Sequence, residues 1–304
     1  MQKPLIICIG AALIDETFKC YSDPLPGTSN PAKSSQSMGG VSRNISHHLA
    51  LLENNVELIT HFGDDADGNW MKEECEKAGI GINHSLTNKS STGKYAAIIS
   101  PSGELFTAAV STDFENLITI EFLETKTHIL KNAKLIQCDC NLSTESLSWI
   151  IRFSQKNNIP CVVEPVSIEK ASRLKGLSLD KVLLLTPNTD ELSSIFCEEH
   201  KESEDALTQI VINIGLQYLW LRNGKEGSTI YTKNEIYKKE APTVNVVDTT
   251  GAGDAALAGW IHAFLLGEDI SQCLNYANAL AKLVLGVKGA IRHDLNPEIL
   301  KVNL

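Results

Sequence analysis

The chain has 304 residues, of which 43% are hydrophobic and 21% are charged, so it is long enough to bury a core without covalent cross-links. Its 37 acidic and 27 basic side chains give a formal net charge of -10, which repels phosphodiester backbones and argues against nucleic acid as a partner. This charge does not exclude a small phosphorylated ligand held by oriented backbone amides. No apolar run approaches the length of about 18 residues that is typical of a transmembrane helix, so we expect no membrane partner.

The eight cysteines favour a reducing compartment. None of them stands in C-x-x-C spacing and several lie inside apolar runs, which is typical of buried free thiols in the cytosol. Cys138 and Cys140 are one residue apart and raise a metal or redox alternative, which we set aside because no His-Cys pair lies nearby. We expect a cytoplasmic protein.

Short apolar runs rich in β-branched residues alternate with amphipathic stretches along the chain. The runs predict buried strands at Leu5–Ile9, Val56–Thr60, Lys134–Gln137, Pro160–Val163, Val182–Leu185 and Tyr218–Leu221. The stretches between them predict helices at Asn44–Leu52, Trp70–Ala78, Thr144–Asn157, Asp190 to about Cys197 and Glu204 to about Ile214. This alternation predicts an α/β fold in which helices cover both faces of a mainly parallel sheet.

Two segments interrupt the alternation. Residues 11–37 are polar and rich in Ser, Pro and Gly, whereas residues 93–112 alternate like paired strands around the turn Pro101-Ser102-Gly103. We expect both to be lid segments of a single domain over residues 1–304, with the second forming a small antiparallel β excursion. Such an excursion would cover an active site, contact a second copy of the chain, or do both. Its exposed strand edges favour a homodimer through the lid.

The segment 247–254, V-D-T-T-G-A-G-D, joins a strand-like run to an Ala-rich helix. Its glycines allow a tight turn that leaves the amides of Gly251, Ala252 and Gly253 at the start of the helix, and such amides bind anions. Asp254 would repel an anion there, but it is well placed to accept a proton from a hydroxyl group that attacks a bound phosphoryl group. For G-A-G alone, an ordinary glycine turn before a helix is the better explanation.

The full string D-T-T-G-A-G-D resembles the signature of the ribokinase-like (PfkB) carbohydrate kinases. Three further stretches resemble motifs of that family and occur in the same order. Residues 38–44, M-G-G-V-S-R-N, resemble its G-G-x-x-x-N motif, residues 61–68, H-F-G-D-D-A-D-G, its G-x-D-x-x-G segment, and residues 186–191, T-P-N-T-D-E, its N-x-x-E motif. The resemblance spans nearly the whole chain. It implies a three-layer ribokinase-like sandwich and an ATP-dependent kinase with Asp254 as its general base.

On the substrate side, the resemblance implies that Asp15, Gly39, Gly40 and Asn44 bind the sugar. Two glycines let the backbone approach a sugar closely, and Asn44 can both donate and accept hydrogen bonds. Asp15 follows the first predicted strand, and ligands of parallel sheets bind beyond the carboxyl ends of strands. A tight loop and a solvated acid in a turn are the alternative interpretations of these residues.

On the nucleotide side, the resemblance implies ATP, Mg2+ and a monovalent cation, potassium. Asn188 and Glu191 would organise Mg2+ largely through water, although their spacing is also typical of a helix-capping pair. Asp248 would contribute to the potassium site. Contacts with ATP are further implied for Arg222, Gly224, Gly227, Thr249 and Asn278.

Within the family, three stretches resemble the pseudouridine kinases: 39–45 (G-G-V-S-R-N-I), 138–143 (C-D-C-N-L-S) and 164–167 (E-P-V-S). They imply that Asp139, Asn141 and Glu164 contact the substrate and that the ribose 5′-hydroxyl of pseudouridine is phosphorylated. A buried strand end would disfavour both Asp139 and Asn141. The alternative substrates are ribose or another nucleoside. The intact motifs disfavour a sugar-binding regulator without catalysis.

The chain departs from the family pattern at three places. Glu164 replaces the usual Asp and is one methylene longer. Arg222 and Asn223 replace the ordinary residues of a T-x-G-x-x-G segment, where a guanidinium beside phosphates and a surface arginine are both reasonable interpretations. The lid sequence 110–114, V-S-T-D-F, also differs, which would alter base preference without altering the chemistry.

Overall fold

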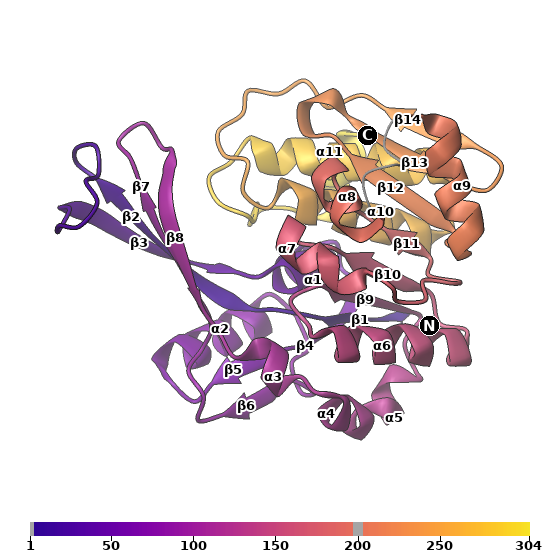
Figure 1. Cartoon of the computed structure of the whole chain (residues 1–304), viewed down its shortest axis with the longest axis horizontal. Coiled ribbons are helices and arrows are strands. Elements are labelled where there is room, and N and C mark those ends of the chain that lie inside the picture. The colour runs from indigo at the N-terminus through magenta and orange to yellow at the C-terminus, as the bar shows by residue number, and fades with distance from the viewer. Residues whose placement is uncertain (1–2, 197–202) are drawn as a thin grey trace.

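A sheet of eight strands forms the centre of the molecule, which the computed structural model describes over residues 3–196 and 203–304 (Figure 1). The strand order is β14-β13-β12-β11-β10-β9-β1-β4; the five pairings from β12 to β4 are parallel and the two at the β14 edge are antiparallel. The prediction of a mainly parallel sheet is confirmed. The strands are β1 (Leu5–Ile9), β4 (Asn55–Ile59), β9 (Leu135–Asp139), β10 (Cys161–Glu164), β11 (Leu184–Leu185), β12 (Tyr218–Arg222), β13 (Ser228–Tyr231) and β14 (Ile236–Lys239).

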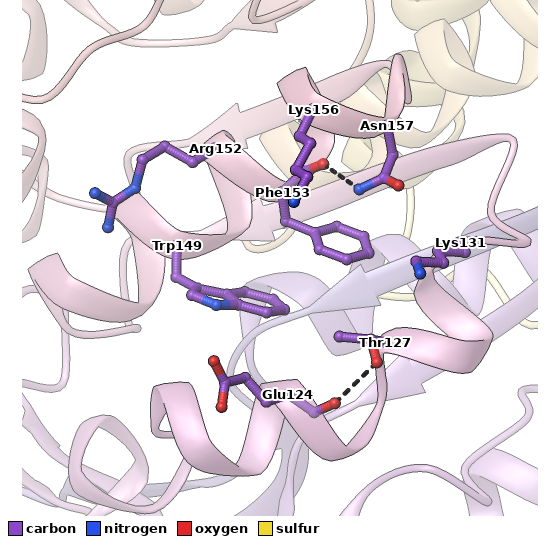
Figure 2. Close-up of a pocket in the computed structure, with 8 residues that line it drawn as sticks. All are labelled: Glu124, Thr127, Lys131, Trp149, Arg152, Phe153, Lys156 and Asn157. Atoms are coloured by element: carbon purple, nitrogen blue, oxygen red, sulfur yellow. Dashed lines mark hydrogen bonds between the residues drawn. The ribbon is translucent and has the colours of Figure 1, made fainter.

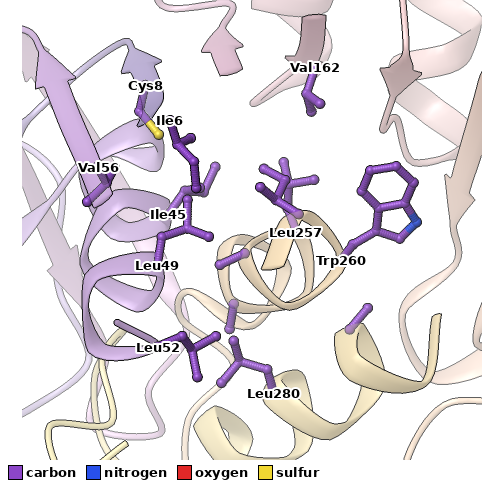
Figure 3. Packing of buried hydrophobic residues seen from close by; sticks show 14 of the residues in the cluster. Ile6, Cys8, Ile45, Leu49, Leu52, Val56, Val162, Leu257, Trp260 and Leu280 are labelled. Atoms are coloured by element: carbon purple, nitrogen blue, oxygen red, sulfur yellow. The ribbon is translucent and has the colours of Figure 1, made fainter. Parts of the chain in front are cut away.

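Helices cover both faces of this sheet, and each face has its own hydrophobic core. Neighbouring residues of a strand point to opposite faces, so Ile6 belongs to one core and Ile7 to the other. The first core includes Leu49 and Trp260 (Figure 3). It is built from α1 (Val41–Leu51), α10 (Ala252–Leu266) and α11 (Ile270–Leu285). The second core is built from α6 (Thr144–Asn157), α8 (Thr189–Phe196) and α9 (Glu204–Ile214). Together these layers give the predicted three-layer sandwich.

Local capping decides where the helices begin. Ser143 caps α6 and Asn158 ends it in the left-handed conformation, so this helix has its predicted bounds. In contrast, α2 (Ala66–Lys77) begins four residues before the predicted Trp70, because the Asp65 side chain accepts a hydrogen bond from the Gly68 N–H. Helix α1 begins directly after Gly40, three residues before the predicted Asn44. The predicted end of α8 at Cys197 lies outside the described residues.

A second sheet projects from the side of the molecule (Figure 1). This small sheet has the order β3-β2-β7-β8, and both of its hairpins, β2–β3 and β7–β8, are antiparallel. It confirms the predicted small antiparallel sheet, while the pairing of β2 with β7, which joins the two hairpins, is parallel. The strands are β2 (Leu13–Cys20), β3 (Ala32–Gly39), β7 (Lys94–Ile99) and β8 (Leu105–Ser111).

The remaining elements are short connections around these two sheets. Strands β5 and β6 pair in parallel beside α2. The bounds are β5 (His61–Gly63), β6 (Leu86–Asn88), α3 (Phe114–Leu117), α4 (Ile120–Thr125), α5 (Thr127–Leu130), α7 (Ile168–Ala171) and α12 (Pro297–Val302), with 3-10 turns η1 (Ser172–Leu174) and η3 (Gly224–Glu226). The seven described cysteines are buried free thiols, as predicted. None of the described helices is long and apolar enough to cross a lipid bilayer.

Candidate functional site

The predicted site residues gather where the parallel strands end. Asp139 is the last residue of β9, Glu164 the last of β10 and Arg222 the last of β12. Helices α1 and α10, which carry Asn44 and Asp254, begin at the same edge and pack against each other. The carboxyl edge of a parallel sheet is where α/β proteins bind ligands, so this edge is the candidate site.

Asp254 and Asn44 are in direct contact across this edge. The Asn44 Nδ2 donates a hydrogen bond of 2.8 Å to the Asp254 Oδ2. Burial raises the pKa of Asp254 to about 7; the bond from Asn44 opposes this rise and the nearby Glu164 charge adds to it. A carboxyl group that titrates near neutral pH is suited to accept a proton from a substrate hydroxyl.

Asp15 lies on β2 and folds back over Gly39 of β3. A Cβ atom on Gly39 would come within 2.1 Å of the Asp15 Oδ2, so only glycine leaves room for this carboxyl group. Burial raises the pKa of Asp15 to about 6, and the charge of Arg43 partly opposes the rise. Gly40 is the N-cap residue of α1 and places Asn44 in the first turns of that helix.

Arg43 is a site residue that the sequence analysis missed. It is only 2% exposed, and its guanidinium donates to the Asn44 Oδ1 over 3.2 Å and to the Met38 carbonyl over 3.3 Å. The charges of both Asp15 and Asp254 stabilise the protonated guanidinium. An arginine between the two glycines and the asparagine of G-G-V-S-R-N was the available signal, because a buried cation there needs acidic partners.

The predicted anion site forms at the start of α10. Gly251 is its N-cap residue, with a φ of 73°, and an added Cβ atom would lie 2.6 Å from the Ala290 side chain. The Ala252 N–H donates to the Thr249 carbonyl over 3.3 Å, and its predicted contact with an anion stays a prediction. Among the described residues, the N–H groups of Gly251, Gly253 and Asp254 have no hydrogen-bond acceptor, so these three remain available for an anion.

Asp248 fixes the loop before this helix. Its Oδ1 accepts hydrogen bonds from the Thr250 N–H and hydroxyl, and its Oδ2 accepts one from the Gly289 N–H. Thr249, between Asp248 and Thr250, is exposed. The carboxylate thus ties two loops together, and its predicted contribution to a potassium site stays a prediction.

Asn188 and Glu191 form a reciprocal capping pair at the start of α8. The Asn188 N–H donates to the Glu191 Oε2, and the Glu191 N–H donates to the Asn188 Oδ1, both over 2.9 Å. Burial raises the pKa of Glu191; the bond from Asn188 opposes this rise and the Glu164 charge adds to it. Glu164 and Glu191 are both buried and lie near a single arginine, Arg222. The two carboxylates therefore leave a surplus negative charge, which fits a divalent cation. No three His, Cys, Asp or Glu side chains within 3–196 and 203–304 gather to hold a metal, so the ion would keep most of its water.

Glu164 is bound by Arg222. The Arg222 Nη2 donates to both Glu164 carboxylate oxygens, over 2.7 and 2.8 Å. The Thr186 hydroxyl donates to the same carboxylate. Protein groups thus occupy both oxygens and Glu164 is 5% exposed, and its predicted contact with substrate stays a prediction.

Asp139 is also satisfied within the protein. Its two oxygens accept five hydrogen bonds, from the Ala11 N–H, from the N–H and hydroxyl of Ser42, and from the N–H and side-chain amide of Asn141. The Asn141 Oδ1 in turn accepts a hydrogen bond from Lys170. Asp139 fixes the loop after β1 to the start of α1, and the predicted contacts of Asp139 and Asn141 with substrate stay predictions.

The remaining nucleotide-side residues border one segment, residues 239–241, of which Glu240 is exposed. The Asn278 Nδ2 donates to the Glu240 carbonyl over 2.6 Å, and Gly227 lies against Lys239 and Ala241. Gly224 begins the turn η3 and connects this segment to Arg222 at the end of β12. Arg222 in turn donates to the Gly253 carbonyl over 3.3 Å, so this group of residues adjoins the start of α10.

Cavity size does not identify the site. A groove of about 500 Å³ lies between α4, α5 and α6, where the rings of Trp149 and Phe153 stack (Figure 2). It contains no residue of the four motifs. The buried ionisable groups locate the candidate site better, because burial raises the pKa values of Asp15, Glu191 and Asp254.

Comparisons with known proteins agree with this geometry. A family model described as pfkB family carbohydrate kinase matches residues 3–297. The chain is 28% identical over 299 residues to a pseudouridine kinase of Escherichia coli (strain K12), covering 97% of this chain and 95% of that protein. It is 30% identical over 259 residues to an uncharacterized sugar kinase of the same strain, covering 84% and 71%. Its fold is similar to that of Arabidopsis thaliana ribokinase complexed with ribose and ATP, with a TM-score of 0.82, 21% identity, and coverage of 100% and 99%.

Proposed function

Since the chain belongs to the pfkB family of carbohydrate kinases, enzymes that transfer a phosphoryl group to a hydroxyl acceptor, we propose that it phosphorylates the ribose 5′-hydroxyl of pseudouridine with ATP. The products would be pseudouridine 5′-phosphate and ADP. The observation that carries the proposal is the contact between Asn44, on the sugar side, and Asp254, beside the anion site. The stretches at 39–45, 138–143 and 164–167 and the similarity to the E. coli pseudouridine kinase support the choice of nucleoside.

In the proposed mechanism, Asp254 accepts the proton of the 5′-hydroxyl as its oxygen forms a bond to the terminal phosphorus of ATP. The bond from that phosphorus to the bridging oxygen breaks, and its electron pair leaves with ADP. The free N–H groups of Gly251, Gly253 and Asp254 donate to the transferring phosphoryl group. Asn188 and Glu191 would hold Mg2+ largely through its waters, and the bound ion would supply positive charge that neutralises the phosphates.

On the sugar side, Asp15 and Asn44 are proposed to bind ribose hydroxyl groups, and Gly39 and Gly40 to let the backbone approach them. Because Asn44 also contacts Asp254, a hydroxyl held by Asn44 would lie within reach of the base. The small sheet carries Asp15 and Gly39, so its position would be coupled to substrate binding. We propose that it covers the bound substrate and excludes water that would otherwise hydrolyse ATP.

On the nucleotide side, we propose that ATP lies along Thr249, the segment 224–227 and Asn278. Most of these positions are exposed, and Arg222, at the strand end before segment 224–227, donates to the Gly253 carbonyl. The phosphates would then approach α10 from its N-terminal end, where the helix dipole favours negative charge.

The proposal is tested by measuring ADP release with ATP and Mg2+ across a panel of pseudouridine, uridine, inosine and ribose. The proposal requires pseudouridine to have the highest kcat/KM, and a reaction without acceptor serves as the control for ATP hydrolysis. Turnover of ribose without turnover of pseudouridine would contradict the assigned substrate but not the family. Ribose is the second candidate, because the fold is similar to that of the plant ribokinase.

We also propose that two copies associate through the small sheet. Strand β8 lies at an edge of that sheet, and its Leu105, Phe106 and Val110 side chains are 59%, 44% and 54% exposed. Sedimentation velocity should show a dimer for the wild type and a monomer for Phe106→Glu combined with Val110→Glu. The control Val302→Glu alters an even more exposed valine on α12, 86% exposed against 54% for Val110, and should leave the dimer intact. A wild type that sediments as a monomer at micromolar concentration would contradict this proposal.

A further inference from the structure

The two strand-end positions at which this chain departs from the family motifs contact each other. Arg222 stands where the T-x-G-x-x-G pattern has threonine, and Glu164 stands where the usual residue is aspartate. They are 58 positions apart in the chain, yet the guanidinium donates to both oxygens of the carboxylate. A side chain without the extra methylene would place its carboxylate further from β12, so the longer acid matches the arginine.

This pair lies against the anion site. The Arg222 Nη1 donates to the Gly253 carbonyl over 3.3 Å, and it lies 3.1 Å from the position of a Cβ atom on Gly253. Gly253 contributes one of the free N–H groups at the start of α10. The charge of Arg222 also acts on Asp254, whose pKa it lowers against the larger effect of burial. The guanidinium is therefore next to both groups that take part in the proposed transfer.

Arg222 also has hydrogen-bonding capacity left for a ligand. A guanidinium has five N–H groups, and the three bonds of Arg222 go to Glu164 and Gly253. Its side chain is 18% exposed, whereas that of Glu164 is 6% exposed, so the arginine lies on the open side of the pair. Glu164 holds the guanidinium in a fixed orientation, which is the arrangement that favours bidentate recognition of phosphate.

We propose that Arg222 is a catalytic residue that contacts the transferring phosphoryl group, and that Glu164 is the positioning residue that aims it. This inference rests on the proposed function and deepens it, since it assigns Arg222 to the terminal phosphate rather than to the adenine or ribose of ATP. The Arg222 guanidinium neutralises charge on the equatorial phosphoryl oxygens while the bond to ADP breaks and the bond to the substrate oxygen forms. The arginine is built into the chain, so no partner protein has to supply it.

The direct test is Arg222→Lys, which keeps the positive charge beside Glu164 and therefore the buried ion pair, but removes the planar fork. We expect kcat to fall about 100-fold. The affinity for ADP, measured by calorimetry, should be unchanged, because ADP lacks the transferring group. Arg173→Lys is the matched control: Arg173 also pairs with a glutamate, Glu115, and its replacement should leave kcat unchanged.

Two further variants separate catalysis from folding. Glu164→Asp keeps the charge but shortens the acid, and should lower kcat with no change in ADP affinity. Glu164→Gln combined with Arg222→Ala avoids a buried unpaired charge. Its turnover should be low and should be restored in part by guanidinium ion at millimolar concentration, a response that a purely structural role would not produce.

Each outcome is decisive. Full kcat in Arg222→Lys, or an equal loss of ATP and ADP affinity, would overturn the inference while leaving the kinase assignment in place. No rescue by guanidinium would also overturn it. A wild type that phosphorylates no acceptor in the panel would overturn the proposed function and this inference together.

Discussion

Asp254→Asn is expected to lower kcat by about 1000-fold, because the amide cannot accept the proton that the substrate hydroxyl releases. The substituted side chain has the same shape and keeps an oxygen atom for Asn44, so affinity for the nucleoside should be largely retained. Steady-state rates give kcat and calorimetry gives the affinity. The control Asp205→Asn alters an exposed acid in the first turn of α9 and should leave both values unchanged.

The pH profile of the same two proteins tests the reason for this loss. Burial raises the pKa of Asp254 to about 7, so the wild-type kcat/KM should increase with pH and reach half its maximum near pH 7. This step should be absent in Asp254→Asn. Because the folded-state pKa is raised, the stability contribution of this carboxyl is fully present below about pH 4 and is lost as pH rises through 7. A midpoint near pH 4, or full turnover in Asp254→Asn, would contradict the assignment of the base.

Asp139→Ala should have the largest effect on stability. The change leaves five hydrogen-bond donors of Ala11, Ser42 and Asn141 without their acceptor at a position that is 0% exposed. We expect the free energy of unfolding to fall by about 3 kcal/mol. Chemical denaturation with urea measures this difference, provided that the slope of the transition is unchanged.

Activity should fall with stability in this variant, because Asp139 fixes the start of α1, and α1 carries Asn44. Asp139→Asn keeps one oxygen acceptor and should destabilise the protein less. The control is Asp113→Ala. Asp113 is an exposed acid before α3 and its side chain does not cap that helix, so this change should leave the free energy of unfolding nearly unaltered. Equal stability of Asp139→Ala and wild type would show that the carboxylate does not hold these loops.

The sequence alone predicted the layers of the fold, because each helix or strand shows its buried face as a hydrophobic pattern within its own segment. Helix α6 is predicted to the residue because its cap, its apolar face and its left-handed end all lie within one stretch. The strands at 13–20 and 32–39 were less visible, because the exposed, Ser-rich face of β3 has no apolar alternation. Those strands are held by pairing with each other, and the sequence pattern of one segment carries no information about its partner.

The sequence correctly placed the glycines and Asp254 at the start of a helix, because one motif contains the whole turn. Asp139 and Glu164 were also correctly placed at strand ends. Their hydrogen-bond partners could not be predicted, because the direction of a carboxylate depends on donors far away in the chain, Ser42 for one and Arg222 for the other. Arg43 was missed because its two acidic partners come from β2 and α10.

The hydrogen bond between Asn44 and Asp254 joins residues 210 positions apart. During synthesis on the ribosome, Asn44 is made long before Asp254, so the two side chains can form their hydrogen bond only late in translation. A nascent chain that already holds β1, α1 and the small sheet therefore has the residues proposed to bind the sugar, but it lacks Asp254, the proposed proton acceptor. Asp254 enters the site only with α10, which packs on α1, so a product truncated before α10 would lack the proposed proton acceptor and part of the first core.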